Sequence, residues 1–385
     1  SRYFLQGEEE LKGSGMDLMK MGLPETADII PWLIDTLKPG EKVAVNAQMF
    51  SVNAYSAMKS ELETVGIELV SIDLMKEVWT DRPDLPKKPF YVFDLKYSGQ
   101  STTDKIAATR AEMAKLRSQV FVMSALDDIA WLFNIRGNDV DFNPVVIAYA
   151  LVEENDVTLF VDQDKLTEET KTYLASVGVR IKAYDAIYSV LEQIESSKTV
   201  LIDGAKLNRA LYESIPAACT KRNAMSPVFK LKSIKNEVEM AGVRQAMVKD
   251  GVALTRFFIW LEENLKSGNL NEVSVDQKLY EFRSKQENFK GESFSTIAGY
   301  GPHGAIVHYR AVPESASTLK PENLFLLDSG GQYLEGTTDI TRTVALGTPT
   351  VKQKIDFTLV LKGHIALATA KFPSGTRGSQ LDILA

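Results

Sequence analysis

Hydrophobic and polar residues follow two different patterns in this chain, and the change comes near residue 228. Before that point, short amphipathic helices alternate with short apolar strands. The stretch Ile29 to Leu37 has apolar residues at helical spacing and ends at Pro39-Gly40, and Lys42 to Asn46 follows as a strand. The same order recurs further along the chain, where Val145 to Val152 and Val157 to Val161 are expected to form a hairpin. This alternation predicts an α/β fold.

The first half of the chain also matches itself in pattern. A shift of 157 residues, without gaps, lays Lys42 to Asn46 on Thr199 to Asp203, and Tyr3-Phe4 on Phe160-Val161. The match lies in pattern more than in identities, and it indicates two copies of one α/β unit. On this hypothesis Tyr3 and Phe4 belong to a strand, and the first copy lacks its front half.

From residue 228 the helices become longer. Ser233 or Asn236 could cap a long helix that runs through Leu265. Strands are expected at 293–297, 305–309 and 324–327, and from Tyr333 onward. The predicted domains are an incomplete α/β domain at 1–98, its repeat at 99–227, and the N-terminal part of a third domain at 228–385.

Composition excludes several classes of function. A net charge of −7 over 385 residues, without a run of Lys and Arg, argues against nucleic acid as a main partner. The single cysteine, Cys219, cannot form an intrachain disulfide. No apolar run approaches the ~18 residues of a membrane-spanning helix.

Two aspartates stand out in the stretch from Leu324 to Leu346. Leu324 to Leu327 is typical of a buried strand, and Asp339 to Val344 alternates as its partner. A hairpin folded about Tyr333-Leu334 would place Asp328 and Asp339 directly opposite each other, with Cβ atoms roughly 4.5–5.5 Å apart. Two carboxylates at such a short distance repel each other unless a proton or a cation lies between them. A divalent ion or a pair of ions is the simplest way to balance their charge. The alternative is two solvated turn aspartates.

Three other polar residues are candidates near this pair. His308 lies in the expected strand 305–309, and could be a ligand, a proton donor or a hydrogen-bonding partner for substrate, or simply a satisfied core or surface group. Thr341 alternates onto the same face as Asp339, where its hydroxyl could hold a carboxylate or a bound water. His303 lies in a Gly-Pro-His-Gly turn, and for it we expect a structural role.

Known motifs for nucleophilic and mononuclear zinc chemistry are missing from the sequence. It contains no G-x-S-x-G elbow, no H-E-x-x-H and no Walker-type phosphate loop. Cys219 has no obvious histidine partner.

Several segments carry a resemblance to a known family. They are Gly301 to Arg310 (GPHGAIVHYR), Leu327 to Tyr333 (LDSGGQY), Gly336 to Thr343 (GTTDITRT) and Ala125 to Gly137 (ALDDIAWLFNIRG). Together they resemble aminopeptidase P, the Xaa-Pro aminopeptidases of the creatinase/methionine-aminopeptidase "pita-bread" family. The resemblance is to the long, three-domain form, whose second domain repeats the first.

The resemblance implies a dinuclear metallopeptidase that releases the N-terminal residue ahead of proline. Asp328 would be mainly a ligand of one metal and Asp339 a bridging ligand of two, usually Mn²⁺, with a metal-bridging hydroxide attacking the peptide carbonyl. His308 would lie beside the scissile bond and stabilise the substrate or the tetrahedral intermediate. Proline-containing peptides would be the partners, in a cytoplasmic homodimer. Arg136, in the Ile-Arg-Gly loop, is either near the cleft or a structural loop arginine.

Three further ligands are expected from the resemblance, one His and two Glu, in motifs downstream of residue 385. Two of five ligands make a poor dinuclear site, so we expect an active parent protein and an inactive segment. Two other hypotheses stay open: a catalytically dead scaffold of the same fold that binds peptides or histones, and a creatinase-type hydrolase without metals. The presence of both aspartates and His308 favours the peptidase.

Overall fold

The computed structural model describes residues 3–385. The helices are α1 (Phe4–Glu10), α2 (Ile29–Thr36), α3 (Val52–Glu63), α4 (Met75–Val78), α5 (Leu95–Ser98), α6 (Thr102–Lys115), α7 (Leu126–Leu132), α8 (Glu168–Ser176), α9 (Ala186–Glu192), α10 (Arg209–Ser214), α11 (Pro227–Ser233), α12 (Glu237–Asn264), α13 (Glu272–Ser284), α14 (Val351–Thr369) and α15 (Gly378–Leu381). Short 3₁₀ helices are η1 (Gln163–Lys165), η2 (Leu265–Ser267), η3 (Gly301–Ala305) and η4 (Asp382–Leu384).

The strands are β1 (Lys42–Val45), β2 (Glu68–Ser71), β3 (Tyr91–Val92), β4 (Val120–Met123), β5 (Ile135–Arg136), β6 (Ala148–Glu153), β7 (Val157–Val161), β8 (Arg180–Lys182), β9 (Thr199–Ile202), β10 (Thr220–Asn223), β11 (Phe289–Glu292), β12 (Ile297–Tyr300), β13 (Leu324–Ser329), β14 (Gly331–Tyr333) and β15 (Ile340–Ala345). Helices and strands alternate through the first half, as the predicted α/β class requires.

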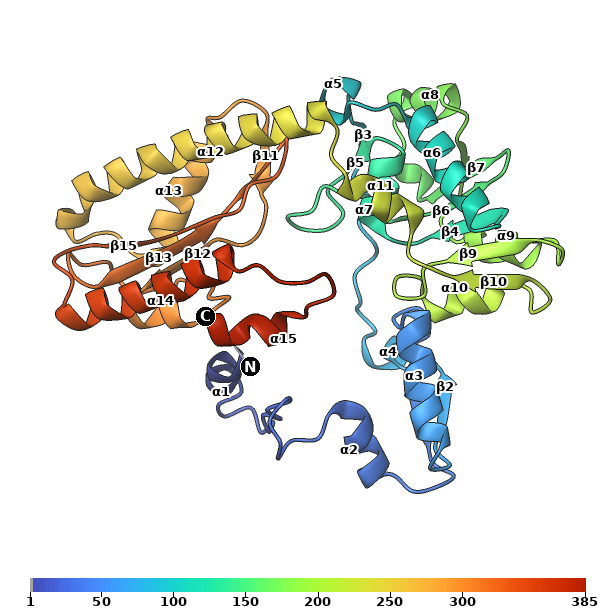
Figure 1. The fold of residues 1–385 in the computed structure, drawn as a ribbon, viewed down its shortest axis with the longest axis horizontal. Helices are drawn as coiled ribbons and strands as arrows, with labels where there is room; N and C mark the ends of the chain where they lie inside the picture. Colours follow the sequence, from blue (N-terminus) through green and yellow to red (C-terminus); the bar gives the residue numbers. More distant parts are fainter. Residues whose placement is uncertain (1–2) are drawn as a thin grey trace.

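A six-stranded mixed sheet forms the centre of the first half, in the order β10-β9-β4-β6-β7-β8. Every residue of β4 and β7 is buried, because helices cover both faces of the sheet (Figure 1). The predicted hairpin is confirmed: β6 and β7 pair antiparallel from Ala148↔Val161 to Val152↔Val157. Two hydrophobic clusters, one on each face, take alternate residues of these strands.

The N-terminal segment has a smaller core of its own. Strands β1 and β2 pair in parallel, and α2 and α3 cover them around Tyr55, Met58 and Leu62. The expected strand at Tyr3-Phe4 is wrong, because Phe4–Glu10 is helical. The residues after Phe4 lack a two-residue alternation, and three successive glutamates favour helix over strand.

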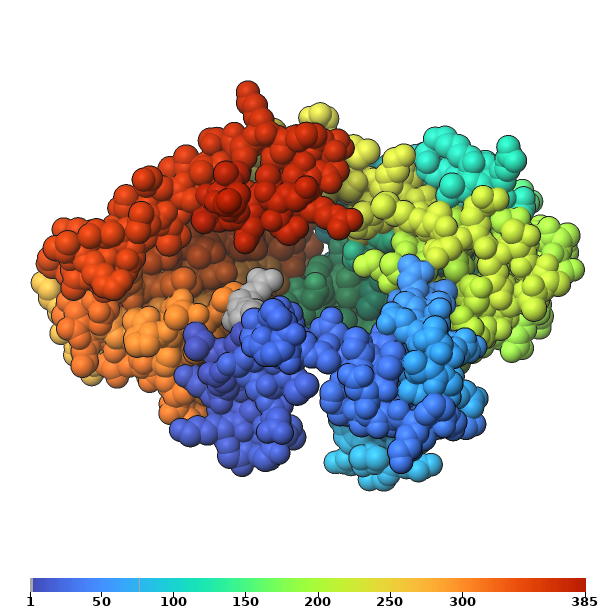
Figure 2. All heavy atoms as spheres, turned by 60° about the horizontal axis from the view of Figure 1, so that its bottom comes forward, coloured from blue at the N-terminus to red at the C-terminus, as the bar shows by residue number. Residues whose placement is uncertain are grey.

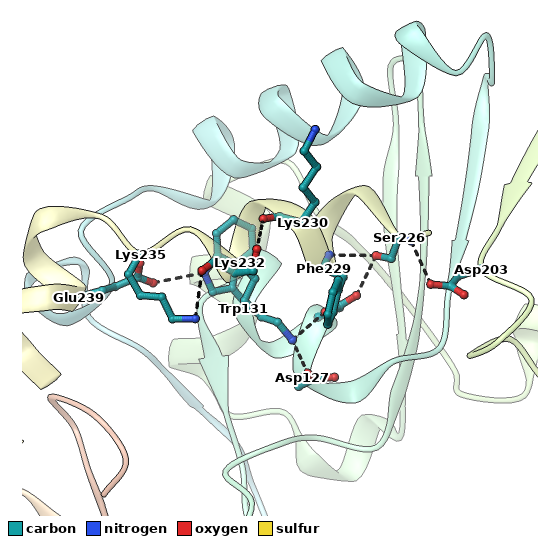
Figure 3. Close-up of polar contacts among 11 residues, drawn as sticks. Asp127, Trp131, Asp203, Ser226, Phe229, Lys230, Lys232, Lys235 and Glu239 are labelled. Carbon is teal, nitrogen blue, oxygen red and sulfur yellow. Dashed lines mark hydrogen bonds and ion pairs between the residues drawn. The ribbon is translucent and has the colours of Figure 1, made fainter. Parts of the chain in front are cut away.

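Helix α11 connects the six-stranded sheet to the C-terminal region through a network of polar contacts (Figure 3). Ser226 caps α11 by accepting from Phe229 N at 3.1 Å, and its hydroxyl donates to Asp128 Oδ2 at 2.8 Å. Lys232, near the end of the helix, pairs with Asp128 at 2.8 Å and also with Asp127. This network fixes the direction in which the chain leaves the six-stranded sheet.

The C-terminal region is built on the long helix α12. Asn236 caps it, as one of the two predicted caps, in a reciprocal capping box with Glu239. The three-stranded antiparallel sheet β12-β13-β15 packs against α12 and α13 around Phe257, Leu279 and Phe325. A separate pair, β11–β14, lies beside it.

Two strand predictions in this region were wrong. The strand expected at 293–297 begins only at Ile297, and the residues before it form a loop. The strand expected at 305–309 is a 3₁₀ turn followed by a bend, because Gly301 takes a positive φ of 56° and Pro302 cannot donate to a strand ladder.

The first and last segments of the described chain lie on the same face of the molecule. Both segments are visible on the face shown in Figure 2, where the N-terminal segment (blue) lies below the C-terminal segment (red). Among residues 3–385, no helix has both the length and the apolar character needed to cross a membrane.

Helix α6 contains an unusual buried lysine. Lys105 is 1% exposed, and its Nζ donates to Trp131 O at 3.0 Å and to Asn134 Oδ1 at 2.7 Å. The same ammonium lies 4.2 Å from the centre of the Trp131 ring. Burial, with a smaller repulsion from Arg136, lowers the pKa of Lys105 to about 7.

This lysine predicts a pH-dependent stability. Since the pKa in the folded state is below the unfolded value, the unfolded chain binds more protons between about pH 7 and 10. The free energy of unfolding is therefore expected to rise with pH in this window, by about 1–2 kcal/mol from pH 7 to 9. Urea unfolding at both pH values measures it. The rise in the free energy of unfolding should be smaller in Lys105→Met. It should persist in the control Lys115→Met, which removes an exposed lysine from the same helix. An unchanged rise in Lys105→Met would contradict the lowered pKa of Lys105.

Candidate functional site

The two aspartates lie on one face of the three-stranded sheet, but not directly opposite each other. Asp328, in β13, pairs with Thr341 of β15, and the ladder ends at the pair Ser329↔Ile340. Asp339 just precedes β15, so it occupies the diagonal position, where Cα atoms are typically about 7–8 Å apart. The expected direct pairing is therefore wrong by two residues, and this even shift keeps both carboxylates on the same face.

The register differs because the connection is not a simple hairpin. After Asp328, β14 leaves the ladder and pairs with β11 instead. The chain then makes a turn of its own, in which Tyr333 N donates to Gly336 O at 2.9 Å. Gly330 lies so close to the returning chain that a Cβ there would be 2.0 Å from Thr338 O. Such a close backbone approach requires glycine at position 330.

Asp328, Asp339 and His308 line one cavity of about 420 Å³. Asp328 is half-buried, and its Oδ1 is shielded from solvent without a hydrogen-bond partner in the described structure. Asp339 is exposed at the mouth. The cavity is completed by Phe294, Ser295, Ile297, Tyr309 and Arg310. The sequence-predicted residues are thus brought together.

His308 reaches the cavity from a turn and not from a strand. It follows η3, in a segment held by Ile306 N donating to His303 O and Tyr309 N donating to Ile306 O, both at 3.1 Å. The imidazole is exposed, and its Nδ1 lies 2.7 Å from Tyr3 Oη. A turn position leaves His308 less rigidly held than Asp328, which lies in β13.

A buried glutamate that the sequence analysis missed anchors this turn. Glu272 is fully buried and accepts hydrogen bonds from Tyr300 N, Ser317 N and Tyr309 Oη, each at 2.8 Å. Its two carboxylate oxygens also lie 2.9 and 3.0 Å from His303 Nδ1. His303 thus has the structural role expected of it. The only sequence signal was a glutamate at a helix start, which is common on exposed helices.

A second buried network lies behind Asp328. Arg283 and Asp250 are fully buried and form a bidentate ion pair at 2.7 and 3.0 Å. Arg283 also donates to Ser329 Oγ at 3.1 Å, and Tyr333 Oη donates to Asp250 at 2.9 Å. This network therefore holds both ends of the β13–β14 segment that follows Asp328.

Thr341 lies on the same face as the two aspartates, as predicted from alternation, and faces Asp328 across the ladder. Its hydroxyl is at an exposed position. His364 is exposed on α14, away from the residues that line the cavity.

The residues present fit part of a site for hard divalent cations. Carboxylate oxygens are the ligands that such cations prefer, and Asp328, whose Oδ1 is shielded and unpartnered, lines the same cavity as Asp339. Within residues 3–385, no group of three or more His, Cys, Asp and Glu side chains is arranged to hold a metal ion. The two aspartates are thus a fragment of a donor set.

Family comparisons agree with the architecture. Residues 81–239 match the creatinase/prolidase N-terminal domain, and residues 241–385 match metallopeptidase family M24. Aminopeptidase P2 of Arabidopsis thaliana is 39% identical, over 99% of this chain and 58% of its own length. A probable Xaa-Pro aminopeptidase P of Laccaria bicolor is 41% identical, over 100% of this chain and 61% of its own length.

Solved structures of an X-prolyl aminopeptidase and a prolidase are also similar to this chain. The X-prolyl aminopeptidase of Caenorhabditis elegans, described as a cytosolic enzyme with a di-nuclear active site, superposes with a TM-score of 0.93 at 35% identity, over 100% of this chain and 64% of its own. The prolidase of Pyrococcus horikoshii, at 20% identity and a TM-score of 0.56, shares the fold over 73% of this chain. This chain spans about 58–61% of the two curated relatives named above.

Proposed function

Because this chain belongs to the Xaa-Pro aminopeptidase family, with creatinase N-terminal and pita-bread M24 regions, we propose that the whole protein is a dinuclear-metal aminopeptidase. Its substrates are peptides with proline in the second position, from which it releases the N-terminal residue. The proposed metal is Mn²⁺.

Each site residue has a separate task in this proposal. Asp328 would hold mainly one metal and Asp339 would be shared by two, while Thr341 would orient a carboxylate or a water from the same face of the sheet. Metal ions bound there supply an activated water and polarise the peptide carbonyl. His308 donates a hydrogen bond to the carbonyl oxygen of the substrate and stabilises the charge that develops on it.

One observation carries the proposal: Asp328, Asp339 and His308, separated by up to 31 positions in sequence, line a single cavity. Among them, the shielded Oδ1 of Asp328 lacks a partner. An acceptor in that state is costly unless a cation or a proton satisfies it. A scaffold that only binds peptides and catalyses no reaction has no physical need for such an unpartnered carboxylate oxygen.

The test is hydrolysis of matched peptides by the whole protein. Metal-depleted enzyme is given Mn²⁺ and assayed for release of the N-terminal residue from an Xaa-Pro peptide and from the same peptide with alanine in place of proline. We expect Mn²⁺-dependent release from the Xaa-Pro peptide only. Equal release from both peptides would exclude the proline requirement, and activity without added metal in the presence of chelator would exclude the metal mechanism.

Residues 1–385 by themselves are proposed not to form a complete site and to be inactive. Two carboxylates give a hard cation far fewer than the about six oxygen ligands it takes. Titration calorimetry of this segment with MnCl₂ is expected to show no site tighter than about 1 mM. Two tight sites would mean that residues within the segment supply the missing ligands.

The organisation of the protein is also part of the proposal. Residues 1–98 and 99–227 are two related α/β domains, the first of them partial, and 228–385 is the N-terminal part of the metallopeptidase domain. The whole protein is a cytoplasmic homodimer. Sedimentation of the whole protein measures its mass, and a monomer would contradict the last point.

A further inference from the structure

A second pocket, of about 190 Å³, lies where β3 and β5 meet the C-terminal region. The two strands contribute Tyr91 and Arg136, and Phe93 follows β3 directly. The other wall includes Lys290 of β11 and the turn at 332–337. Strands β3 and β5 lie on the side of the six-stranded sheet that faces β11 (Figure 1). None of the cavity-lining residues of the candidate active site takes part.

Arg136 is the centre of this pocket. Its Nη1 donates to Ala130 O and Ile135 O, both at 2.9 Å, and its guanidinium lies 4.1 Å from the centre of the Phe93 ring. These contacts fix the plane of the guanidinium and leave Nε and Nη2 for another acceptor. Within the described chain no carboxylate is within 4.0 Å of this side chain, so it is not the simple structural ion pair of a loop arginine.

Two lysines extend the positive charge. Lys290 is exposed and lies 5.9 Å from the centre of the Tyr91 ring, which is itself the strand partner of Arg136. Lys235 is exposed beside the start of α12 and donates to Ser233 O at 3.4 Å. Neither lysine forms an ion pair with a described carboxylate. The three cations therefore line one pocket, and none of them forms an ion pair within 4.0 Å of a described carboxylate.

Both carboxylates of the pocket accept hydrogen bonds, although Oε2 of Glu335 is shielded and has no partner in the described structure. Glu239 accepts from Trp131 Nε1 at 3.3 Å and from Asn236 N at 3.0 Å, as the left side of Figure 3 shows for the tryptophan. Glu335 accepts from Lys249 and Asn288, each at 2.7 Å. Since Lys249 balances Glu335, three cations face one remaining carboxylate, and the pocket carries excess positive charge.

We propose that this pocket binds a small oxyanion, either a free phosphate-type anion or the C-terminal carboxylate of a peptide. Arg136 holds it by its free N–H groups, which match the geometry of carboxylate and phosphate oxygens. Lys290 and Lys235 add charge from the rim, and the rings of Tyr91 and Phe93 form an apolar wall.

The pocket is close enough to the candidate active site for one peptide to reach both. Gln332, in its wall, is four residues beyond Asp328, and Thr337 is two residues before Asp339. At about 3.4 Å per extended residue, Gln332 is at most roughly 14 Å from Asp328, and Thr337 is at most roughly 7 Å from Asp339. A bound anion also contacts the turn that connects the two aspartates, so it is expected to steady that turn.

The test measures binding to the metal-free whole protein, so that it does not depend on the proposed peptidase activity. Inorganic phosphate is titrated by calorimetry into the wild type, Lys290→Ala and the control Lys320→Ala, an exposed lysine that lines neither pocket. We expect phosphate to bind the wild type and the control equally, and Lys290→Ala about tenfold more weakly. Arg136→Gln, which keeps a donor for the backbone carbonyls, should abolish binding.

A second arm separates the two sources of the anion. The same Xaa-Pro peptide is titrated with a free C-terminal carboxylate and with a C-terminal amide. If the acid binds about tenfold more tightly than the amide, and this difference is lost in Lys290→Ala, the pocket binds the peptide carboxylate. If acid and amide bind equally while phosphate still binds, the pocket binds a free anion. The proposal is overturned if neither phosphate nor the acid peptide binds in a way that depends on Lys290. Because Lys290 is exposed, its variants remain informative even if Arg136→Gln does not fold.

Discussion

The Asp339→Ala variant of the whole protein is expected to lose Mn²⁺-dependent release from Xaa-Pro peptides by at least about a thousandfold. Asp339 lines the same cavity as Asp328 and is proposed to contribute oxygen ligands there. Without it, the proposed bridge between two metals is missing, and the chemistry that depends on both is lost. The initial rate of N-terminal residue release at saturating Mn²⁺ measures this effect.

The same variant should remain folded. Asp339 is exposed, and substitutions at such positions usually change the free energy of unfolding by less than about 0.5 kcal/mol. The matched control is Asp84→Ala, which removes an exposed aspartate far from Asp339 in sequence and should keep full activity. Retained activity in Asp339→Ala would remove this residue from the site, and lost activity in Asp84→Ala would point to a general effect of removing charge.

The second large effect concerns stability. Asp250→Ala leaves the fully buried guanidinium of Arg283 without its bidentate partner, and breaking a buried pair in this way typically costs about 3–5 kcal/mol. Tyr333 Oη loses its acceptor as well. We expect a clear fall in the midpoint of thermal unfolding of the whole protein. Because Arg283 also holds Ser329, the neighbour of Asp328, kcat should fall in the fraction that remains folded.

Two controls make this prediction specific. Asp356→Ala removes one member of an exposed pair with Lys352, and such pairs contribute only about 0–1 kcal/mol. The double variant Asp250→Leu/Arg283→Met replaces the buried pair by apolar side chains and should recover much of the lost stability. If Asp250→Ala destabilises no more than Asp356→Ala, the pair is not the stabilising contact that its burial indicates.

Local pattern was sufficient for most of the secondary structure. The start of helix α12 could be predicted, because its cap Asn236 and the glutamate three residues later are both short-range signals. Likewise, β7 is a continuous apolar run with a turn before it, and it pairs with β6 as predicted. A weak pattern gave a wrong prediction at the N-terminus: a strand is expected at Tyr3-Phe4 by analogy with a distant repeat, but Phe4–Glu10 is a helix.

The site was predicted in part. The residue types and their approximate spacing identified Asp328, Asp339 and His308, which do line one cavity. Their geometry was not predictable, because it depends on β14 leaving the ladder to pair with β11, about 40 residues earlier in the chain. Glu272 was missed for the same reason, since its donors come from three separate segments.

By itself the sequence determined the α/β class, much of the order of helices and strands, and which residue types could hold a metal, because periodicity, caps and charge are local properties. Only the tertiary structure decided the two-residue offset between Asp328 and Asp339, the turn that carries His308, and the pocket around Arg136. Each of these depends on contacts between segments far apart in the chain, where packing and backbone hydrogen bonding outweigh local preference.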